Sequence, residues 1–539
     1  MDNLDQTYAG RRRTRRGNRR NAGRDTAAAG GRIDGQPGGQ LGGLAGWQDI
    51  QTNLPPLTPL SADQLEAVHQ ASLQLLEEYG IEVMSADVRA RFRAAGADVD
   101  EASMIVRADR GLILAAIASA PPVFRLTPTN PQRALTVGGR HIHFGMVSGA
   151  PNVHDIAGGR RSGNFEDYKK LIKLGQSFNI LHFFGNQTLA PNDLPVSTRH
   201  LDTVFANLTL SDKIFMSMSI GAERVRDTAA LTAIARGISL DEMADDPSSI
   251  TNININSPRK LDVEMAAAAI AMAEMGQAVV VTPFTLMGAM TPVTLAAALT
   301  QQNAEALFAI ALTQLARPGA PVVYGGFTSN VDMKTGAPAF GTPEFVRAMQ
   351  ISGQLARFYG LPLRASNANA ANALDAQAVW ESAFSLQGSC SGGANLIYHA
   401  AGWMEGGLSA SFEKFVIDCE MLQQIIYTQR PIQVDASTLA VDEIAEVGPH
   451  GHFFGCDHTQ QRYCDAFYTP LLSDWRNYET WLDDGGLWAH QRAATQCKTV
   501  LKEYVEPPMD SSSREELVDF VDRRKADGGA ETEFLLSKK

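Results

Sequence analysis

The sequence has few cysteines and no long apolar segment, and both features restrict its class. Only 5 of the 539 residues are cysteine, and no two of them form a Cys-x-x-Cys pair. A sparse and odd set in a chain of this length argues against a disulfide framework and favours a reducing, cytoplasmic location. No stretch approaches the roughly 20 apolar residues of a membrane helix, and the N-terminus lacks the apolar core of a secretory signal. We therefore expect a cytoplasmic protein that does not enter a membrane.

Positive charge and nucleotide-binding motifs are also scarce. Lys and Arg number 47 against 59 Asp and Glu, for a net charge of -12. Phosphate binding needs a basic surface, so we do not expect a nucleic-acid partner. No Gly-x-Gly-x-x-Gly follows an apolar segment, which disfavours a dinucleotide-binding sheet. The Arg- and Gly-rich residues 1–45 are the exception. They are predicted to be a disordered tail, and the alternative is a basic arm that touches nucleic acid or an acidic partner.

What the sequence does contain is a repeated alternation of short apolar segments and helices. From residue 178 the repeat is roughly 30 to 45 residues long, which is typical of β/α units and a parallel sheet. Seven or eight units predict a (β/α)₈ barrel over residues 178–430 rather than an open sheet. The expected strands are residues 180–184, 214–218, 250–255, 278–282, 320–324, 361–365 and 395–398, with a short eighth candidate at 407–410.

The regions on either side of this repeat have other patterns. In residues 46–177 we expect helices, one capped by Ser61, and a β-hairpin that turns at Gly138-Gly139. Residues 431–539 predict amphipathic helices that wrap the barrel or form a homo-oligomer interface. The predicted fold class is thus α/β, a TIM barrel with an N-terminal helical and hairpin addition and a C-terminal helical extension. Thr291-Pro292 and Thr342-Pro343 predict helix starts, each a capping hydroxyl before proline.

The residues after each predicted strand define the candidate site, because barrels place their sites at the strands' C-terminal ends. Aromatic and amide side chains prevail there and basic ones are few, which suits a neutral or cationic small ligand better than a phosphate ester. Aromatic faces attract quaternary ammonium groups, although each aromatic alone is more often a core residue. The predicted substrate-binding residues are Phe184, Asn186, Phe284, Phe327, Asn367, Tyr398 and Trp403, and the predicted catalytic residues are His399 and Glu405.

Three other motifs suggest chemistry that we do not expect. Residues 388–392 read Gly-Ser-Cys-Ser-Gly, the spacing of a nucleophile elbow around Cys390, but an elbow turns from strand to helix and here a helix comes first. His141 and His143 share a strand face without a third metal ligand nearby. A last group matches no common zinc spacing, and it consists of His452, Cys456, His458 and Cys464. We therefore expect no tightly bound metal in this chain.

Several segments resemble the trimethylamine methyltransferase family. They are residues 155–161, 375–378, 392–403, 405–418, 448–453 and 458–459, and they occur in the family's order within about residues 55–505. The resemblance implies a TIM barrel that transfers a methyl group from a methylated amine to the Co(I) of a separate corrinoid protein. It therefore implies cobalamin as a cofactor carried by a partner protein. Gly326, Asn369 and Gly402 are predicted to face that corrinoid.

The choice of amine depends on a departure from the family pattern. Members that use trimethylamine carry pyrrolysine at a position that aligns within residues 366–372, where this chain reads Ser-Asn-Ala-Asn-Ala-Ala-Asn. Relatives without pyrrolysine are associated with quaternary amines such as glycine betaine. A quaternary nitrogen leaves as a neutral amine, so the protein has only to hold the cation, exclude water and orient the methyl group. A quaternary amine is the predicted substrate, with a folate acceptor or a non-catalytic betaine-binding protein as alternatives. Arg364 could pair with a substrate carboxylate, but its place inside a predicted strand favours a structural role.

Overall fold

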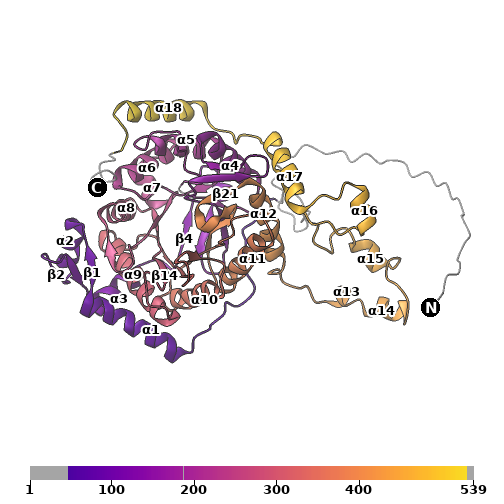
Figure 1. Cartoon of the computed structure of the whole chain (residues 1–539), viewed down its shortest axis with the longest axis horizontal. Helices are drawn as coiled ribbons and strands as arrows, with labels where there is room; N and C mark the ends of the chain where they lie inside the picture. Colours follow the sequence, from indigo (N-terminus) through magenta and orange to yellow (C-terminus); the bar gives the residue numbers. More distant parts are fainter. Residues whose placement is uncertain (1–45, 186, 531–539) are drawn as a thin grey trace, which may run out of the picture. The chain divides into compact units, whose positions relative to one another are not determined.

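The computed structural model describes residues 46–185 and 187–530, and its centre is a closed barrel of parallel strands surrounded by helices (Figure 1). Hydrogen-bonded ladders join the strands in the order β10-β9-β6-β19-β18-β15-β13-β11. A parallel bridge between Met216 and Ile250 closes the ring between β10 and β11. The barrel strands are β6 (His143–Met146), β9 (Phe183–Phe184), β10 (Ile214–Phe215), β11 (Ile250–Ile253), β13 (Ala278–Val281), β15 (Val322–Gly325), β18 (Leu363–Ser366) and β19 (Leu396–Ala401).

A helix follows each of these strands and packs outside the ring. In chain order these helices are α4 (Phe165–Ser177), α5 (Arg199–Leu210), α6 (Ala222–Arg236), α8 (Val263–Glu274), α9 (Leu295–Ala316), α10 (Pro343–Phe358), α11 (Ala376–Ser391) and α12 (Phe412–Tyr427), with a short α7 (Leu240–Asp245) after α6. The predicted (β/α)₈ fold class is therefore confirmed. Each of the seven expected strand segments overlaps a barrel strand, from β9 to β19.

The first barrel strand lies upstream of the segment expected to begin the barrel. β6 was expected to form a hairpin with β5 (Leu135–Gly138), but β5 pairs with β4 (Val123–Leu126), and β6 pairs in parallel with β19 and β9. The hairpin prediction is wrong because all four residues of β6 are buried, and a strand buried on both faces has no alternating pattern to identify it. The candidate at 407–410 is also wrong, since β21 (Ser409–Ser411) pairs with β20 (Trp403–Met404) and β7 (Asn152–Asp155) outside the barrel.

The β4–β5 hairpin closes the N-terminal end of the barrel. Its apolar residues are buried in one cluster with inward-facing residues of the barrel strands, and Trp47 packs against the same cluster. The hairpin contributes Phe124, Leu126, Leu135 and Val137 to that cluster. The lower half of the barrel is thus a packed core, as is usual for eight-stranded barrels. The interior of the barrel is therefore filled at this end, and the barrel mouth is at the opposite end.

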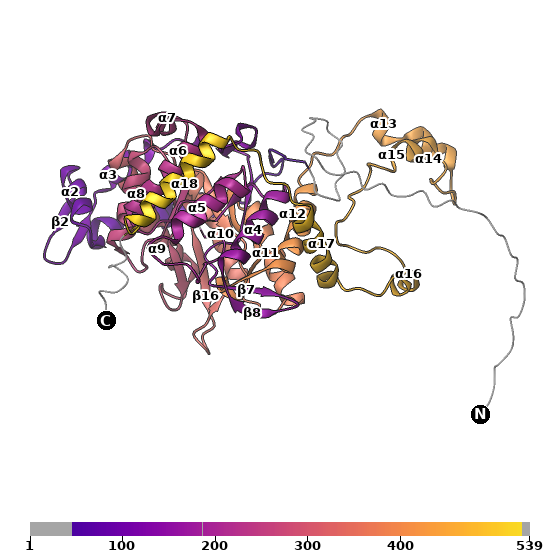
Figure 2. The same cartoon turned by 90° about the horizontal axis from the view of Figure 1, so that it is seen from above.

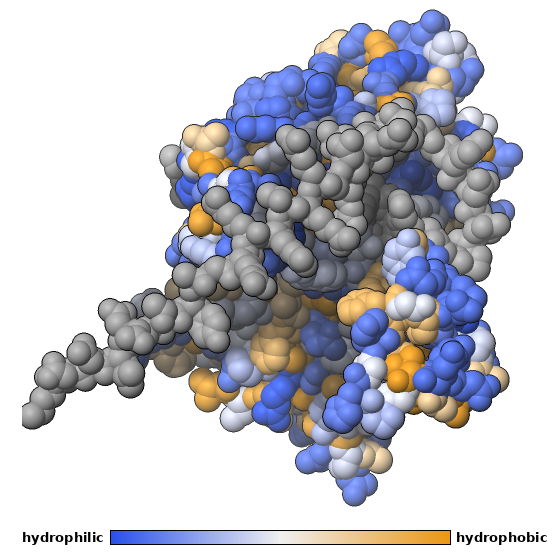
Figure 3. Space-filling model, turned by 90° about the vertical axis from the view of Figure 1, so that its right-hand side faces the viewer, coloured by the Kyte–Doolittle hydropathy of each residue, from blue (hydrophilic) through white to orange (hydrophobic). Residues whose placement is uncertain are grey.

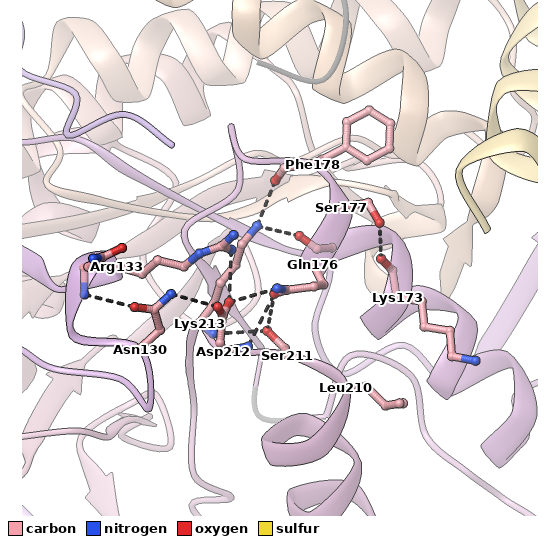
Figure 4. A network of polar contacts seen from close by, with 12 residues as sticks. Asn130, Arg133, Lys173, Gln176, Ser177, Phe178, Leu210, Ser211, Asp212 and Lys213 are labelled. Atoms are coloured by element: carbon pink, nitrogen blue, oxygen red, sulfur yellow. Dashed lines mark hydrogen bonds and ion pairs between the residues drawn. The ribbon is translucent and has the colours of Figure 1, made fainter. Parts of the chain in front are cut away.

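A polar network joins the segment before β5 to α4 and to the chain that enters β10 (Figure 4). The Lys213 ammonium is wholly buried and donates hydrogen bonds to the carbonyl oxygens of Gly175 and Phe178 at 2.7 and 2.9 Å. Burial lowers the pKa of Lys213 well below its usual value. Its neighbour Asp212 pairs with Arg133 at 3.1 Å. These bonds join α4, β10 and the chain entering β5, and we assign them a structural role.

The N-terminal addition packs on one helix of the ring. Its helices α1, α2 and α3 all contact α9. Ser61 caps α1 as predicted, in a capping box with Gln64. The addition consists of α1 (Ala62–Gln74), a π-helical turn (Leu75–Tyr79), β1 (Ile81–Val83), α2 (Ala86–Ala94), β2 (Asp98–Asp100), β3 (Ile105–Arg107) and α3 (Arg110–Ala118). Of the two proline-marked helix starts, Thr342 caps α10 as predicted, whereas α9 begins after Thr294 and not after Thr291.

The C-terminal extension has two kinds of helix. Two are long: α17 (Ala489–Glu503) packs on α12, and α18 (Ser511–Ala526) lies along α5 and α6 (Figures 1 and 2). The short helices have no buried residue, and they are α13 (Ala436–Leu439), α14 (Val441–Val447), α15 (Asp457–Arg462) and α16 (Tyr478–Asp483). Their segment leaves large apolar side chains such as Phe454 and Trp488 exposed, and hydrophobic and hydrophilic residues are interspersed on the face shown in Figure 3. No helix in the described ranges has the length and apolar character needed to span a membrane.

Candidate active site

A pocket of about 170 Å³ lies at the C-terminal end of the barrel strands. This is the end at which barrel proteins bind their ligands, and it is opposite the packed hairpin floor. Among the described residues its lining consists of Ser148, Asn252, Asn254, Thr282, Phe284, Phe327, Phe340, Arg364, His399, Trp403, Gly406 and Gly407. Aromatic and small polar residues thus prevail, and Arg364 is the one lining residue of permanent charge in this set.

Four aromatic rings form one wall of the pocket. Phe284 begins β14 (Phe284–Met287) and pairs in parallel with Phe327, which begins β16 (Phe327–Val331). The ring centres are 5.4 Å apart for Phe284 and Phe327, 5.5 Å for Phe327 and Phe340, and 5.6 Å for Phe340 and Trp403. Both β14 and β16 continue the direction of a barrel strand that has just ended, so they present their first residue to the barrel mouth. A continuous aromatic surface of this kind suits apolar groups and methylated cations.

Arg364 enters the pocket from β18 and has no anionic partner among the described residues. Its side chain packs between two rings: the guanidinium carbon is 4.4 Å from the centre of Tyr398 and 5.6 Å from that of Phe327. One Nη donates a long hydrogen bond, 3.4 Å, to the carbonyl oxygen of Gly326, and Nε has no hydrogen-bond partner. Burial lowers the pKa of Arg364 to about 10, so it remains a cation at neutral pH. A buried cation without a counterion is energetically unfavourable.

His399 lines the same pocket as this arginine and lies at a bulge in β19. The strand register shifts between Ile397 and Ala401, and His399 has a φ of 56° within the shift. Bulges redirect side chains in this way near active sites. The imidazole stacks on Trp403 with ring centres 5.4 Å apart, and its Nδ1 has no hydrogen-bond partner. Burial, and secondarily the charge of Arg364, lower the pKa of His399 well below its usual value, so the ring is neutral at pH 7.

A buried ion pair supports the loop that carries Trp403. Lys414 and Asp418 on α12 are both fully buried, with Nζ and Oδ1 2.6 Å apart. Asp418 accepts a hydrogen bond from the backbone N–H of Gly402 at 2.8 Å, and the Lys414 ammonium donates to the hydroxyl of Ser382 at 2.8 Å. These contacts hold the chain on either side of Gly402 in one position. Sequence reasoning missed them, although Lys and Asp four residues apart on a helix were a visible signal.

The structure brings together four of the predicted site residues, and they are Phe284, Phe327, His399 and Trp403. Tyr398 lies directly beneath Arg364 and is buried. Asn367, at the end of β18, is buried with no hydrogen-bond partner for either amide atom. Asn369 donates to the carbonyl oxygen of Trp403 at 2.6 Å and therefore supports the same loop as Asp418.

The other predicted residues are not among the described residues that line the pocket. Glu405 forms an ion pair with Arg160 at 2.8 Å. Phe184 belongs to the main hydrophobic core. Gly326 packs so closely on Gln302 that a Cβ would overlap it, and Gly402 serves the loop contact described above. Asn186 and the tail of residues 1–45 lie outside the described residues. Sequence reasoning did not select the pocket residues Asn252, Asn254, Thr282 and Phe340.

Two of the motifs from which we expected no chemistry, the one around Cys390 and the pair His141 and His143, have clear positions in the structure. Cys390 lies in the last turn of α11, before β19, so the chain runs from helix to strand as expected. Burial raises the pKa of its thiol to about 12, which keeps it protonated. Among the residues that the structure describes, the one group of three potential metal ligands is Asp49, His141 and His143.

Fold and pocket together define a class: an α/β-barrel protein with a pocket at the C-terminal end of its strands, lined by an aromatic wall and one buried arginine. The sequence profile of the trimethylamine methyltransferase (MTTB) family matches residues 18–529, so the chain belongs to that family, as the sequence motifs predicted. The family includes methyltransferases that act on methylamines and on glycine betaine.

Individual relatives match over most of their length. The chain is 34% identical over 479 residues to glycine betaine methyltransferase of Desulfitobacterium hafniense (strain Y51), which covers 89% of this chain and 99% of the relative. It is 29% identical to trimethylamine methyltransferase MttB of Desulfitobacterium hafniense (strain DSM 10664 / DCB-2), with 88% and 95% covered. The crystal structure of the Methanosarcina barkeri monomethylamine methyltransferase (MtmB) shares 10% identity with a TM-score of 0.45, over 83% of this chain and 93% of that one.

Proposed function

We propose that this protein transfers a methyl group from a quaternary amine that also carries a carboxylate, of the glycine betaine type, to the Co(I) of a corrinoid held by a partner protein. The observation that carries this proposal is Arg364, a buried cation in the pocket without an anionic partner among the described residues. The 34% identity to a glycine betaine methyltransferase supports the same substrate class.

The charge of the pocket discriminates between amine classes. None of its described lining residues is acidic, and His399 is neutral at pH 7. A substrate that is only cationic, such as choline or protonated trimethylamine, would bring a second positive charge close to Arg364. A betaine supplies a carboxylate for the guanidinium fork, a pairing that is short, strong and often bidentate. Its ammonium end then meets the aromatic wall, where each ring contributes about 0.5–2 kcal/mol of cation–π attraction.

The residues of this chain have a limited chemical task. The departing group is a neutral tertiary amine, so no side chain has to protonate it, and a neutral His399 is consistent with that. Arg364 and the wall residues orient the substrate with one N-methyl group toward the mouth, and the apolar lining excludes water. The corrinoid, when its carrier docks, supplies the nucleophile. We assign Glu405 a positioning role: its ion pair with Arg160 holds the chain next to Gly406 and Gly407, which line the pocket.

An assay with cob(I)alamin tests the proposal. The protein is incubated without oxygen with cob(I)alamin and either glycine betaine or choline, and methylcobalamin is followed by its absorbance. We expect methylcobalamin from glycine betaine and far less from choline. No methylcobalamin from any quaternary amine would contradict the proposal. Binding of glycine betaine without demethylation would instead favour a binding protein, and methyl transfer to tetrahydrofolate would favour the folate alternative.

A further inference from the structure

Three potential metal ligands lie together at the N-terminal end of the barrel, remote from the methyl-transfer pocket. A nitrogen of His141, a nitrogen of His143 and a carboxylate oxygen of Asp49 all lie within 4.8 Å of one another. The sequence indicated no third ligand for the two histidines. The structure supplies this third ligand. Gln51, in the chain that enters the barrel, forms an antiparallel bridge with His141, and this pairing brings Asp49 close to the two histidines.

His143 has the hydrogen bonding of a histidine prepared for a metal. Its side chain is 1% exposed. Nε2 lies 2.8 Å from the carbonyl oxygen of Thr136 and must donate to it, which leaves a lone pair on Nδ1. That Nδ1 is buried without a hydrogen-bond partner. Histidines that bind metals commonly donate their other nitrogen to a backbone carbonyl in this way, which fixes the tautomer and the ring orientation.

The neighbouring His182 shows that this arrangement is specific to His143. The two rings are in edge contact with centres 5.2 Å apart. In His182, however, both nitrogens are used: Nδ1 accepts from the Phe144 N–H at 3.1 Å, and Nε2 lies 3.1 Å from the carbonyl oxygen of Gln48. His182 is therefore a satisfied core histidine, whereas His143 has one nitrogen left for a further ligand.

The other two ligands can adjust to an ion and are reached from solvent. Asp49 Oδ1 is 2.9 Å from His141 Nδ1, and the Asp49 side chain is 54% exposed. Donor atoms on a tetrahedral ion with bonds of 2.0–2.1 Å are about 3.3 Å apart. Atoms that lie up to 4.8 Å apart must therefore move closer on binding, and His141 and Asp49, which are less buried than His143, are the residues that we expect to move. His141 also lines a surface groove of about 660 Å³, which provides an entry path and room for a water as fourth ligand.

We propose that Asp49, His141 and His143 bind one divalent transition-metal ion, zinc or a similar ion with a preference for imidazole, with water as the fourth ligand. Two imidazoles and one carboxylate form a ligand set that suits zinc, cobalt(II) and nickel(II) better than calcium or magnesium. The ion fastens the entering chain to the floor of the barrel. Residues at the N-terminal end of a barrel usually contribute to stability and not to catalysis.

Cobalt(II) titration of the chelator-treated full-length protein tests this, because its visible absorption reports the ligands directly. We expect one equivalent to bind with a band of a nitrogen and oxygen site and without thiolate charge transfer. Asp49→Asn and His141→Ala should each weaken binding by at least about tenfold. Zinc should raise the midpoint of thermal unfolding of the wild type and not of these variants.

The controls separate this site from others in the chain. Cys456→Ser with Cys464→Ser removes the thiols of the C-terminal extension and should leave the titration unchanged. Three results would overturn the proposal: no binding by the wild type at micromolar cobalt, equal binding by Asp49→Asn and His141→Ala, or loss of binding in the cysteine variant. None of these results depends on methyl transfer.

Discussion

The guanidinium carbon of Arg364 lies 4.4 Å from the centre of the Tyr398 ring, and these two residues occupy adjacent barrel strands. Burial raises the pKa of the Tyr398 hydroxyl, so the ring is neutral and supports the cation only through its π face. The aromatic contact orients the guanidinium but does not neutralise it. The charge remains available to a ligand in the pocket.

Replacing Arg364 should therefore affect carboxylated substrates selectively. We expect Arg364→Met to raise the KM for glycine betaine by about 10- to 150-fold, because charge-assisted hydrogen bonds contribute about 1.5–3 kcal/mol. The weak reaction with choline should fall less or even improve. Arg226→Met, on the exposed side of α6, is the control. An equal decrease in activity with glycine betaine and with choline would show that Arg364 does not bind the carboxylate.

The aromatic wall should determine affinity for the ammonium end. Trp403→Leu keeps an apolar side chain but removes the indole face, and we expect a rise in KM of about 3- to 30-fold. The measurement is steady-state methylcobalamin formation over a range of glycine betaine concentrations. Trp380→Leu, on an exposed part of α11, should leave KM unchanged. An unaltered KM in Trp403→Leu would place the ammonium elsewhere.

The stability of the protein should depend on Lys414 and Asp418 being present together. Lys414→Met leaves a buried carboxylate without its cation and should lower the free energy of unfolding by about 3–5 kcal/mol. Lys414→Met combined with Asp418→Leu should recover a large part of that loss, since neither charge is then left alone. Urea unfolding measures both. The surface pair of Lys169 and Glu166 is the comparison, where Lys169→Met should cost less than about 1 kcal/mol. A double variant no more stable than the single one would argue against this account.

His399 should make the protein less stable in mild acid. Its folded-state pKa lies below the usual value, so below about pH 6.5 the unfolded chain binds a proton that the folded chain does not. Stability therefore falls as the pH decreases from 6.5 toward the folded pKa, by up to about 1.4 kcal/mol per pH unit for this group. His399→Gln removes this group. The slope of the unfolding free energy against pH between pH 6 and 5 should therefore decrease by up to the contribution of one proton, about 1.4 kcal/mol per pH unit. His452→Gln is an exposed control, and identical slopes in His399→Gln and wild type would refute the prediction.

The sequence predicted the barrel well where strands are apolar runs between capped helices. Val279, Val280 and Val281 of β13 are an example, because parallel strands buried on both faces read as continuous β-branched segments. It failed at β6, where histidine and glycine interrupt the apolar pattern and a Gly-Gly pair precedes it. One of the two neighbours of β6 is β19, at the far end of the barrel sequence, and no local signal can predict such a pairing.

The candidate site was predictable in part for a similar reason. Loops directly after strands contain Phe284, Phe327 and Trp403, so strand prediction located them. Arg364 was expected to be structural because it lies within a strand, yet an inward-facing residue near the C-terminal end of a barrel strand reaches the pocket. Phe340 enters the wall from a separate loop after β17 (Pro338–Ala339), and its position depends on tertiary packing.

The pairing of β6 with β19 also has a consequence for synthesis of the chain on the ribosome. His143 pairs opposite Leu396 across roughly 250 intervening residues. At translation rates of about 5–20 residues per second, the first strand of the barrel waits about 10 to 50 s for its last neighbour. During that interval one edge of β6 is unpaired, and it is open to other nascent chains. Chaperone dependence during expression should therefore be greatest for truncated chains that end before β19.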